Sequence, residues 1–168
     1  FYNMADTVIV GRILGMNALA AVGATGSIVW LTTGSIQGLT TGFAAITAQC
    51  FGANDLSGIK KSFGISIVIS AIFTAFLMWI CIAFAMPLLE LLQTPEEIIK
   101  DSYSYIMWIF IGLFATTIFN LLSNMIRALG DSRTHLVFLI IACIVNIILD
   151  IVFIYGLKMG PSGAGLAT

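Results

Sequence analysis

A carboxylate and an amide stand inside an apolar segment near the carboxyl end of the sequence, IVNIILDIVFIYG. Asp150 is the only charged residue of this segment, and Asn146 precedes it by four residues. In a helix this spacing places both side chains on one face. Carboxylate and amide oxygens are hard ligands that suit Na⁺, and a carboxylate can instead hold an exchangeable proton. The pair therefore predicts a site that exchanges a small cation.

A second acid, Asp6, lies in the segment FYNMADTVIVGR, and Tyr2 shares its helical face. Asp6 precedes Gly11 by five residues, about 8 Å along a helix, and Asp150 precedes Gly156 by six, about 9 Å. Neither acid has a Lys or Arg one helical turn away on its own segment. The two acids are therefore expected at similar depths in the same site.

The overall composition indicates what surrounds these acids. The chain has 168 residues, 60% of them hydrophobic and 9% charged, and its mean hydropathy is +1.08. Soluble domains carry about 25% charged residues, so the sequence predicts an all-α integral membrane protein, a polytopic helix bundle in the lipid bilayer. A charged carboxylate in that environment is costly unless it faces a cavity, a partner or a proton. The net charge of −1 gives no indication of nucleic-acid binding.

Four apolar stretches are long enough to cross about 30 Å of hydrocarbon, which takes about 20 residues. The predicted spans are 24–48, 62–86, 102–125 and 136–156, with partial helices at 1–10 and 163–168. Residues 11–23, rich in Gly and Ala, are expected to form a loop or a short surface helix. Because the sequence starts and stops within apparent helices, we expect it to be a fragment of a longer protein.

The short connections make successive spans antiparallel, so the second and fourth connections share one side of the membrane. These two connections carry Lys60, Lys61, Arg127 and Arg133. Positive residues are enriched in cytoplasmic loops, which predicts that this side is cytoplasmic. The first partial helix and the 136–156 helix then run outward together.

Other small and polar residues recur at helical spacing. Gly34, Gly38 and Gly42 predict close packing against another helix, with a sliding or bending helix as the alternative. Asn124 and Thr117 are expected to connect helices by hydrogen bonds. The three cysteines have no metal-binding spacing and we expect no cofactor.

Several motifs resemble those of multidrug and toxic compound extrusion (MATE) transporters, in the family's order and spacing. They are ADTVIVGRILGMNALAAVGATGSI, GFAAITAQCFGAND, RALGDSRTH, NIILDIVFIYG and GPSGAGLAT. The resemblance covers essentially the whole chain and implies one lobe, the amino-terminal one, of a twelve-helix transporter of the MATE/MOP type. The carboxy-terminal lobe of the same protein would be missing. Such transporters of the cytoplasmic (inner) membrane expel small cationic amphipathic compounds in exchange for Na⁺ or H⁺, by alternating access.

The resemblance also implies roles for individual residues. In the DinF-like branch, the cation- or proton-coupling site matches Asp6, Asn146, Asp150 and Thr168. The first three of these would hold Na⁺ where Na⁺ is the coupling ion. The residues that match the family's substrate cavity are Tyr2, Tyr105 and Asn120.

Three other functions fit the sequence less well. A related flippase of lipid-linked saccharides is expected to hold pyrophosphate with basic residues, and the predicted spans contain no Lys or Arg. A structural membrane subunit without transport would pair the buried acids with bases of partner chains. An enzyme is less favoured, because the only histidine, His135, stands at a predicted helix start without a metal-like partner, and no nucleophile–base arrangement stands out.

Overall fold

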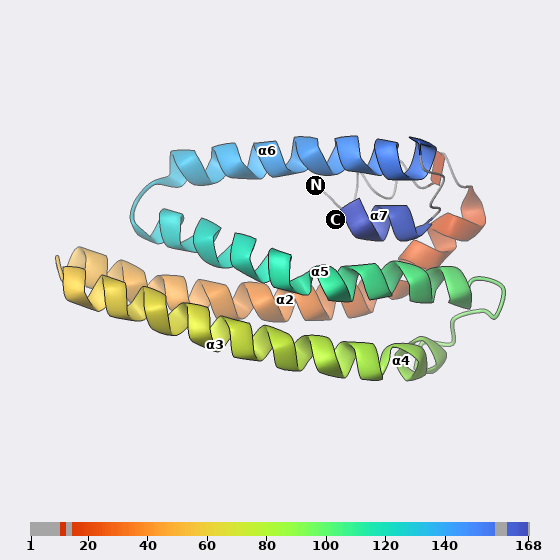
Figure 1. Ribbon diagram of the computed structural model, residues 1–168, viewed down its shortest axis with the longest axis horizontal. Coiled ribbons are helices and arrows are strands. Elements are labelled where there is room, and N and C mark those ends of the chain that lie inside the picture. The colour runs from red at the N-terminus through yellow and green to blue at the C-terminus, as the bar shows by residue number, and fades with distance from the viewer. Residues whose placement is uncertain (1–10, 13–14, 157–160, 168) are drawn as a thin grey trace. The chain divides into compact units, whose positions relative to one another are not determined.

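The computed structural model describes residues 11–12, 15–156 and 161–167 (Figure 1). Every element in these ranges is a helix. The elements are α2 (Met16–Gly52), α3 (Leu56–Ala83), α4 (Ala85–Leu91), α5 (Ile99–Ala128), α6 (Ser132–Asp150), the π-helix η1 (Ile151–Gly156) and α7 (Pro161–Ala167). The helices α2, α3, α5 and α6, the last continued into η1, are long and apolar enough to cross a membrane. The predicted all-α membrane bundle is therefore confirmed.

The first long helix begins earlier than the sequence suggested. Residues 16–23 form the first turns of α2, so the loop or separate surface helix expected at 11–23 is wrong for this part. Alanine has the highest intrinsic helix propensity, and Ala18 and Ala21 are buried in the core, where packing stabilises these turns. Gly15 precedes the helix with φ of 87°, a left-handed conformation that glycine adopts without strain.

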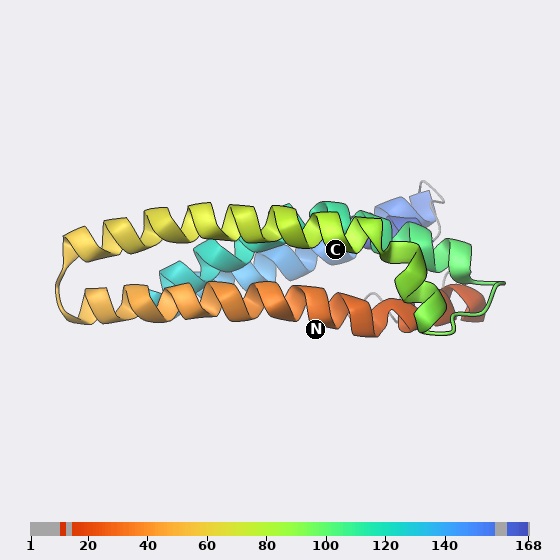
Figure 2. The ribbon, with the colours of Figure 1, turned by 90° about the horizontal axis from the view of Figure 1, so that it is seen from below.

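A proline ends the second long helix. Pro87 has no N–H to donate to the carbonyl of Ala83, and its ring would clash with that carbonyl. Accordingly α3 ends at Ala83, before the predicted end of the span at 86. The chain bends at Phe84, and α4 leaves the line of α3 (Figure 2). Proline is well tolerated in the first turn of α4, where no helical N–H partner is needed.

Two short connections turn the chain back on itself, between α2 and α3 and between α5 and α6 (Figures 1 and 2). Each ends with an aspartate that caps the next helix. Asp55 Oδ1 accepts a hydrogen bond from Gly58 N, and Asp131 Oδ1 accepts one from Thr134 N, both at 2.9 Å. The bonds from Thr134 lower the pKa of Asp131 below its ordinary value. Such caps satisfy amide groups that have no partner within the helix.

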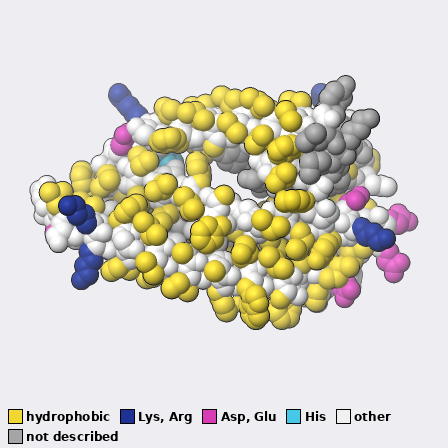
Figure 3. All heavy atoms as spheres, viewed as in Figure 1, with side chains coloured by type: hydrophobic (Ala, Val, Ile, Leu, Met, Phe, Trp, Pro, Cys, Tyr) yellow, Lys and Arg dark blue, Asp and Glu magenta, His cyan; other side chains and the backbone are white. Residues whose placement is uncertain are grey.

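The chain divides into two compact units, to which the four long helices all contribute. Unit 1 comprises Phe1–Trp30, Met78–Gly112 and Ile141–Thr168, and unit 2 comprises Leu31–Leu77 and Leu113–Ile140. On the face shown in Figure 3, many hydrophobic side chains lie at the surface of the long helices, and the charged side chains gather near helix ends. The four basic residues of the two predicted cytoplasmic connections all belong to unit 2.

Hydroxyl and amide side chains join the helices of unit 2. Thr74 of α3 and Thr117 of α5 are 2.8 Å apart, and Asn124 Nδ2 donates to Thr40 Oγ1 of α2 at 3.1 Å. These bonds confirm the predicted helix-linking role of Thr117 and Asn124. Helices in hydrocarbon gain little from apolar burial, so small side chains and hydrogen bonds hold them together.

The three glycines spaced by four residues in α2 do not lie at a contact between the helices that the structure describes. Gly34, Gly38 and Gly42 lie on an exposed face, and a Cβ built on any of them meets no atom within 4 Å. The prediction that this face packs against another helix is therefore wrong for the part of the chain that the structure describes. The buried face of α2 instead carries threonines at roughly two-turn intervals, namely Thr25, Thr32, Thr40 and Thr47.

Candidate functional site

The buried face of α6 consists of two polar residues. Asn146 is 5% exposed and Asp150 is fully buried, and they are the buried residues of this helix. Large apolar side chains of the same helix, such as Ile144 and Ile148, are about half exposed. An amphipathic helix of a soluble protein buries its apolar side chains and exposes its polar ones, and α6 has the reverse arrangement. The predicted pair therefore faces the interior of unit 1, and the apolar side chains face outward.

A change of helix type follows directly after the acid. Residues Ile151–Gly156 form the π-helix η1, so Asp150 is the last residue in α-helical geometry. Ile154 of η1 is 2% exposed and continues the buried face at the next turn. Short π-helical segments are rare and frequently occur at functional sites. The wider turn sets the position of Asp150 relative to the segment that follows.

Asn146 connects this face to α7. Its Nδ2 donates to the backbone carbonyl of Ala167 at 3.3 Å. Its Oδ1 is buried and has no hydrogen-bond partner among the described residues. The Asn146 amide oxygen lies one helical turn from the Asp150 carboxylate, so two oxygen groups of the type that binds hard cations share one buried face.

A close approach of two helices holds α7 in place. A Cβ on Gly165 would lie 2.6 Å from the backbone oxygen of Tyr105 and 3.3 Å from Trp108 Cβ. Only glycine therefore allows α7 to lie this close to α5. Ala167, two residues further along α7, is the partner of Asn146. The glycine contact consequently positions the carbonyl that Asn146 binds.

The predicted cavity residues lie in different surroundings. Tyr105 is 5% exposed and packs in an apolar cluster of unit 1 that includes Ala18, Ile154 and Ala164. Asn120 belongs to unit 2, is half-buried, and donates to Thr116 O of its own helix at 2.9 Å. Their roles in a substrate cavity remain predictions. The other predicted site residues, Tyr2, Asp6 and Thr168, lie outside the described residues.

The structure adds two contacts that the sequence did not reveal. The Ala167 carbonyl carries no sequence signal, because every residue has the same backbone group. Ser123 Oγ and His135 Nδ1 are 2.6 Å apart, across the short connection between α5 and α6. Their separation of twelve residues would have indicated this contact only once the turn between the helices was known.

Comparison with known proteins identifies the family. The MatE family model matches residues 1–152. The chain is 31% identical over 99% of its length to the probable multidrug resistance protein YpnP of Bacillus subtilis. It is 31% identical over 97% of its length to the multidrug resistance protein PmpM of Pseudomonas aeruginosa. It is also 25% identical to an FAD transporter of Shewanella oneidensis.

Solved structures agree with these sequence relatives. The inward-facing conformation of a multidrug resistance MATE family transporter of the MOP superfamily has a TM-score of 0.93 and 27% identity, over 99% of this chain and 38% of that one. A MATE in its bent conformation has a TM-score of 0.90 and 27% identity. The chain spans about 35–38% of the length of these sequence relatives. It has the fold of one lobe of such a transporter, and it belongs to the MATE family.

Proposed function

We propose that this chain is the amino-terminal lobe of a cation-coupled antiporter. The whole transporter would export cationic amphipathic compounds across the cytoplasmic membrane by alternating access, in exchange for Na⁺ or H⁺. One observation carries the proposal: the buried face of α6 consists of Asn146 and Asp150, while its apolar residues face outward. A helix needed only for packing would not bury an acid, because an amide alone could join helices at lower cost.

The acid supplies the free-energy difference that exchange requires. With Asp150 ionised, the lobe attracts a cationic substrate, and arrival of Na⁺ or H⁺ from outside neutralises the same carboxylate. A ligand shifts a conformational equilibrium only through its different affinities for the two states. Asp6 and Thr168 complete this coupling site in the proposal, on the strength of the family resemblance. Neutralisation would then release the substrate outward.

The proposal is tested with the full-length protein in proteoliposomes, using the fluorescent cation ethidium. Asp150→Asn keeps the size of the side chain and removes the charge, so ethidium flux driven by an imposed gradient should fall at least tenfold. Asp131→Asn is the matched control, since Asp131 lies in an exposed connection and asparagine caps a helix equally well. Equal flux in the Asp150→Asn variant and the wild type would refute the coupling role.

The coupling ion is separated by driving the same vesicles with a Na⁺ gradient at equal pH, or with a pH gradient without Na⁺. If Na⁺ binds the pair, Asn146→Leu removes one oxygen ligand and should raise the Na⁺ concentration needed for half-maximal flux. If a proton neutralises Asp150, this variant should shift the pH dependence without creating a Na⁺ requirement. FAD, the cargo named for one relative, carries phosphates, so its inclusion as a competitor tests selectivity for positive charge.

A further inference from the structure

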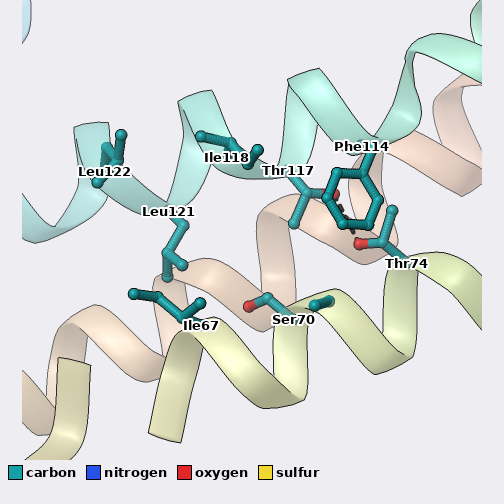
Figure 4. A pocket seen from close by; sticks show the side chains of 9 residues that line it. Ile67, Ser70, Thr74, Phe114, Thr117, Ile118, Leu121 and Leu122 are labelled. Atoms are coloured by element: carbon teal, nitrogen blue, oxygen red, sulfur yellow. Dashed lines mark hydrogen bonds between the residues drawn. The ribbon is translucent and has the colours of Figure 1, made fainter. Parts of the chain in front are cut away.

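A groove of about 360 Å³ lies between α3 and α5, entirely within unit 2 (Figure 4). Its outer walls are apolar, and Ile67, Phe114, Ile118 and Leu122 are each between 44% and 49% exposed. This volume is at the lower end of the range for small-molecule sites, about 300–1,000 Å³. No Lys, Arg, Asp or Glu lines it among the described residues.

The base of the groove carries three hydroxyl groups, two of which satisfy each other. Thr117 donates to Leu113 O at 2.8 Å, so Thr74 is the donor in the 2.8 Å bond between Thr74 and Thr117. Ser70 is different: its Oγ is buried, and no hydrogen-bond partner for it lies among the described residues. Figure 4 places this oxygen on the side of α3 that faces α5.

The same helix shows how such a hydroxyl is ordinarily satisfied. Ser66, one turn before Ser70, is also buried and donates to Ser62 O of its own helix at 2.7 Å. Serine in membrane helices commonly bonds the preceding turn in this way. Ser70 instead lines an apolar groove with a buried hydroxyl group that has no hydrogen-bond partner among the described residues. A buried polar group of this kind requires an acceptor.

The depth of Ser70 restricts where that acceptor can come from. Ser70 lies at the middle of α3 (Leu56–Ala83), a helix long and apolar enough to cross a membrane. The ester groups of phospholipids lie at the edge of a hydrocarbon core about 30 Å thick, too far away to reach it. An acyl chain has no acceptor at this depth. A cation would have no counter-charge in the groove and would be costly there.

We propose that the α3–α5 groove binds neutral apolar or aromatic molecules that carry a hydrogen-bond acceptor, and that Ser70 Oγ donates to that acceptor. This goes beyond the proposed cation-coupled export, because the ligand is uncharged and its binding requires neither Asp150 nor an ion gradient. The apolar walls supply the area that such a ligand buries. Ser70 selects, among molecules dissolved in the hydrocarbon, those with a carbonyl or ether oxygen.

Benzophenone is a suitable probe, since it is neutral and aromatic, has one carbonyl, and inserts into nearby C–H bonds under ultraviolet light. We expect tritiated benzophenone to label the full-length protein in proteoliposomes saturably, on peptides that include 67–74 and 114–122. Ser70→Ala should raise the half-saturating concentration about threefold to tenfold, which corresponds to the loss of one hydrogen bond. Ser66→Ala, the matched control on the same helix, should leave it unchanged.

A competition measured on the wild type makes the test independent of how the variants fold. Fluorenone keeps the carbonyl and diphenylmethane lacks it. The concentration of diphenylmethane that displaces half of the benzophenone should therefore be about threefold to tenfold higher than that of fluorenone. Ala71→Phe should fill the groove and abolish labelling of both peptides. Labelling elsewhere only, unsaturable labelling, or equal competition by the two compounds would overturn the proposal. So would an unlabelled groove, as expected if a lipid chain or another helix covers it.

Discussion

Gly165→Ala tests whether the contact between α7 and α5 positions the partner of Asn146. The added Cβ would lie 2.6 Å from Tyr105 O, whereas ordinary contacts begin near 3.4 Å. The obstacle is a backbone oxygen inside a helix and cannot rotate away. We therefore expect the two helices to separate by about 0.8 Å, the difference between these distances, at a cost of about 1–3 kcal/mol, typical of overpacking. The bond from Asn146 to Ala167 is already 3.3 Å long and should break.

The assay is thermal unfolding of the full-length protein in detergent, together with gradient-driven ethidium flux. Gly165→Ala should lower both the unfolding temperature and the flux. Gly112→Ala is the control, because a Cβ at Gly112 meets no atom within 4 Å and the change removes a flexible residue from α5. It should be neutral or stabilise by about 0.5–1 kcal/mol. If Gly165→Ala were as stable and active as the control, the close contact would not position α7.

Two further predictions concern unit 2. The hydrogen bonds from Thr134 lower the pKa of Asp131. The ionised Asp131 cap should therefore stabilise the fold at neutral pH, and this stabilisation should be lost as pH falls through the lowered pKa. Asp131→Asn should remove this part of the pH dependence of unfolding. Thr74→Val should break the bond to Thr117 and destabilise by about 0.6 kcal/mol, the average for such bonds in membranes. Chemical unfolding in detergent measures this destabilisation, with Ser35→Ala as the control, because Ser35 is only half-buried and donates to Leu31 O of its own helix. An equal effect of the Thr74 and Ser35 changes would contradict the helix-linking role.

The sequence predicts the features that depend on the free-energy cost of placing a polar or charged residue in hydrocarbon. Asp150 and Asn146 stand out in an apolar segment, and the structure buries both. Long uncharged stretches predicted the membrane helices for the same reason. By contrast, the spacing of the glycines in α2 predicts that they share one helix face, but spacing alone does not indicate whether another helix packs against that face. The face that contacts other helices carries threonines, which spacing rules for glycine do not detect.

Other features depended on contacts between distant segments. The π-helix after Asp150 has no composition that distinguishes it from the α-helical residues before it. The Ala167 carbonyl and the close approach at Gly165 are set by how α7 packs, and α7 was predicted only as the start of a helix. Ser70 and Ser66 look alike in sequence, and only the structure shows that Ser66 bonds Ser62 O whereas the Ser70 hydroxyl has no partner among the described residues.

The outward-facing apolar residues of α6 have a consequence for how the helix is oriented. Turning α6 about its own axis would exchange one aliphatic side chain for another at the lipid boundary, with little change in free energy. The same turn would bring Asn146 and Asp150 into hydrocarbon, which is costly. The polar pair, rather than apolar burial, therefore fixes the rotational setting of this helix. Any event that alters the charge of Asp150 acts directly on that setting.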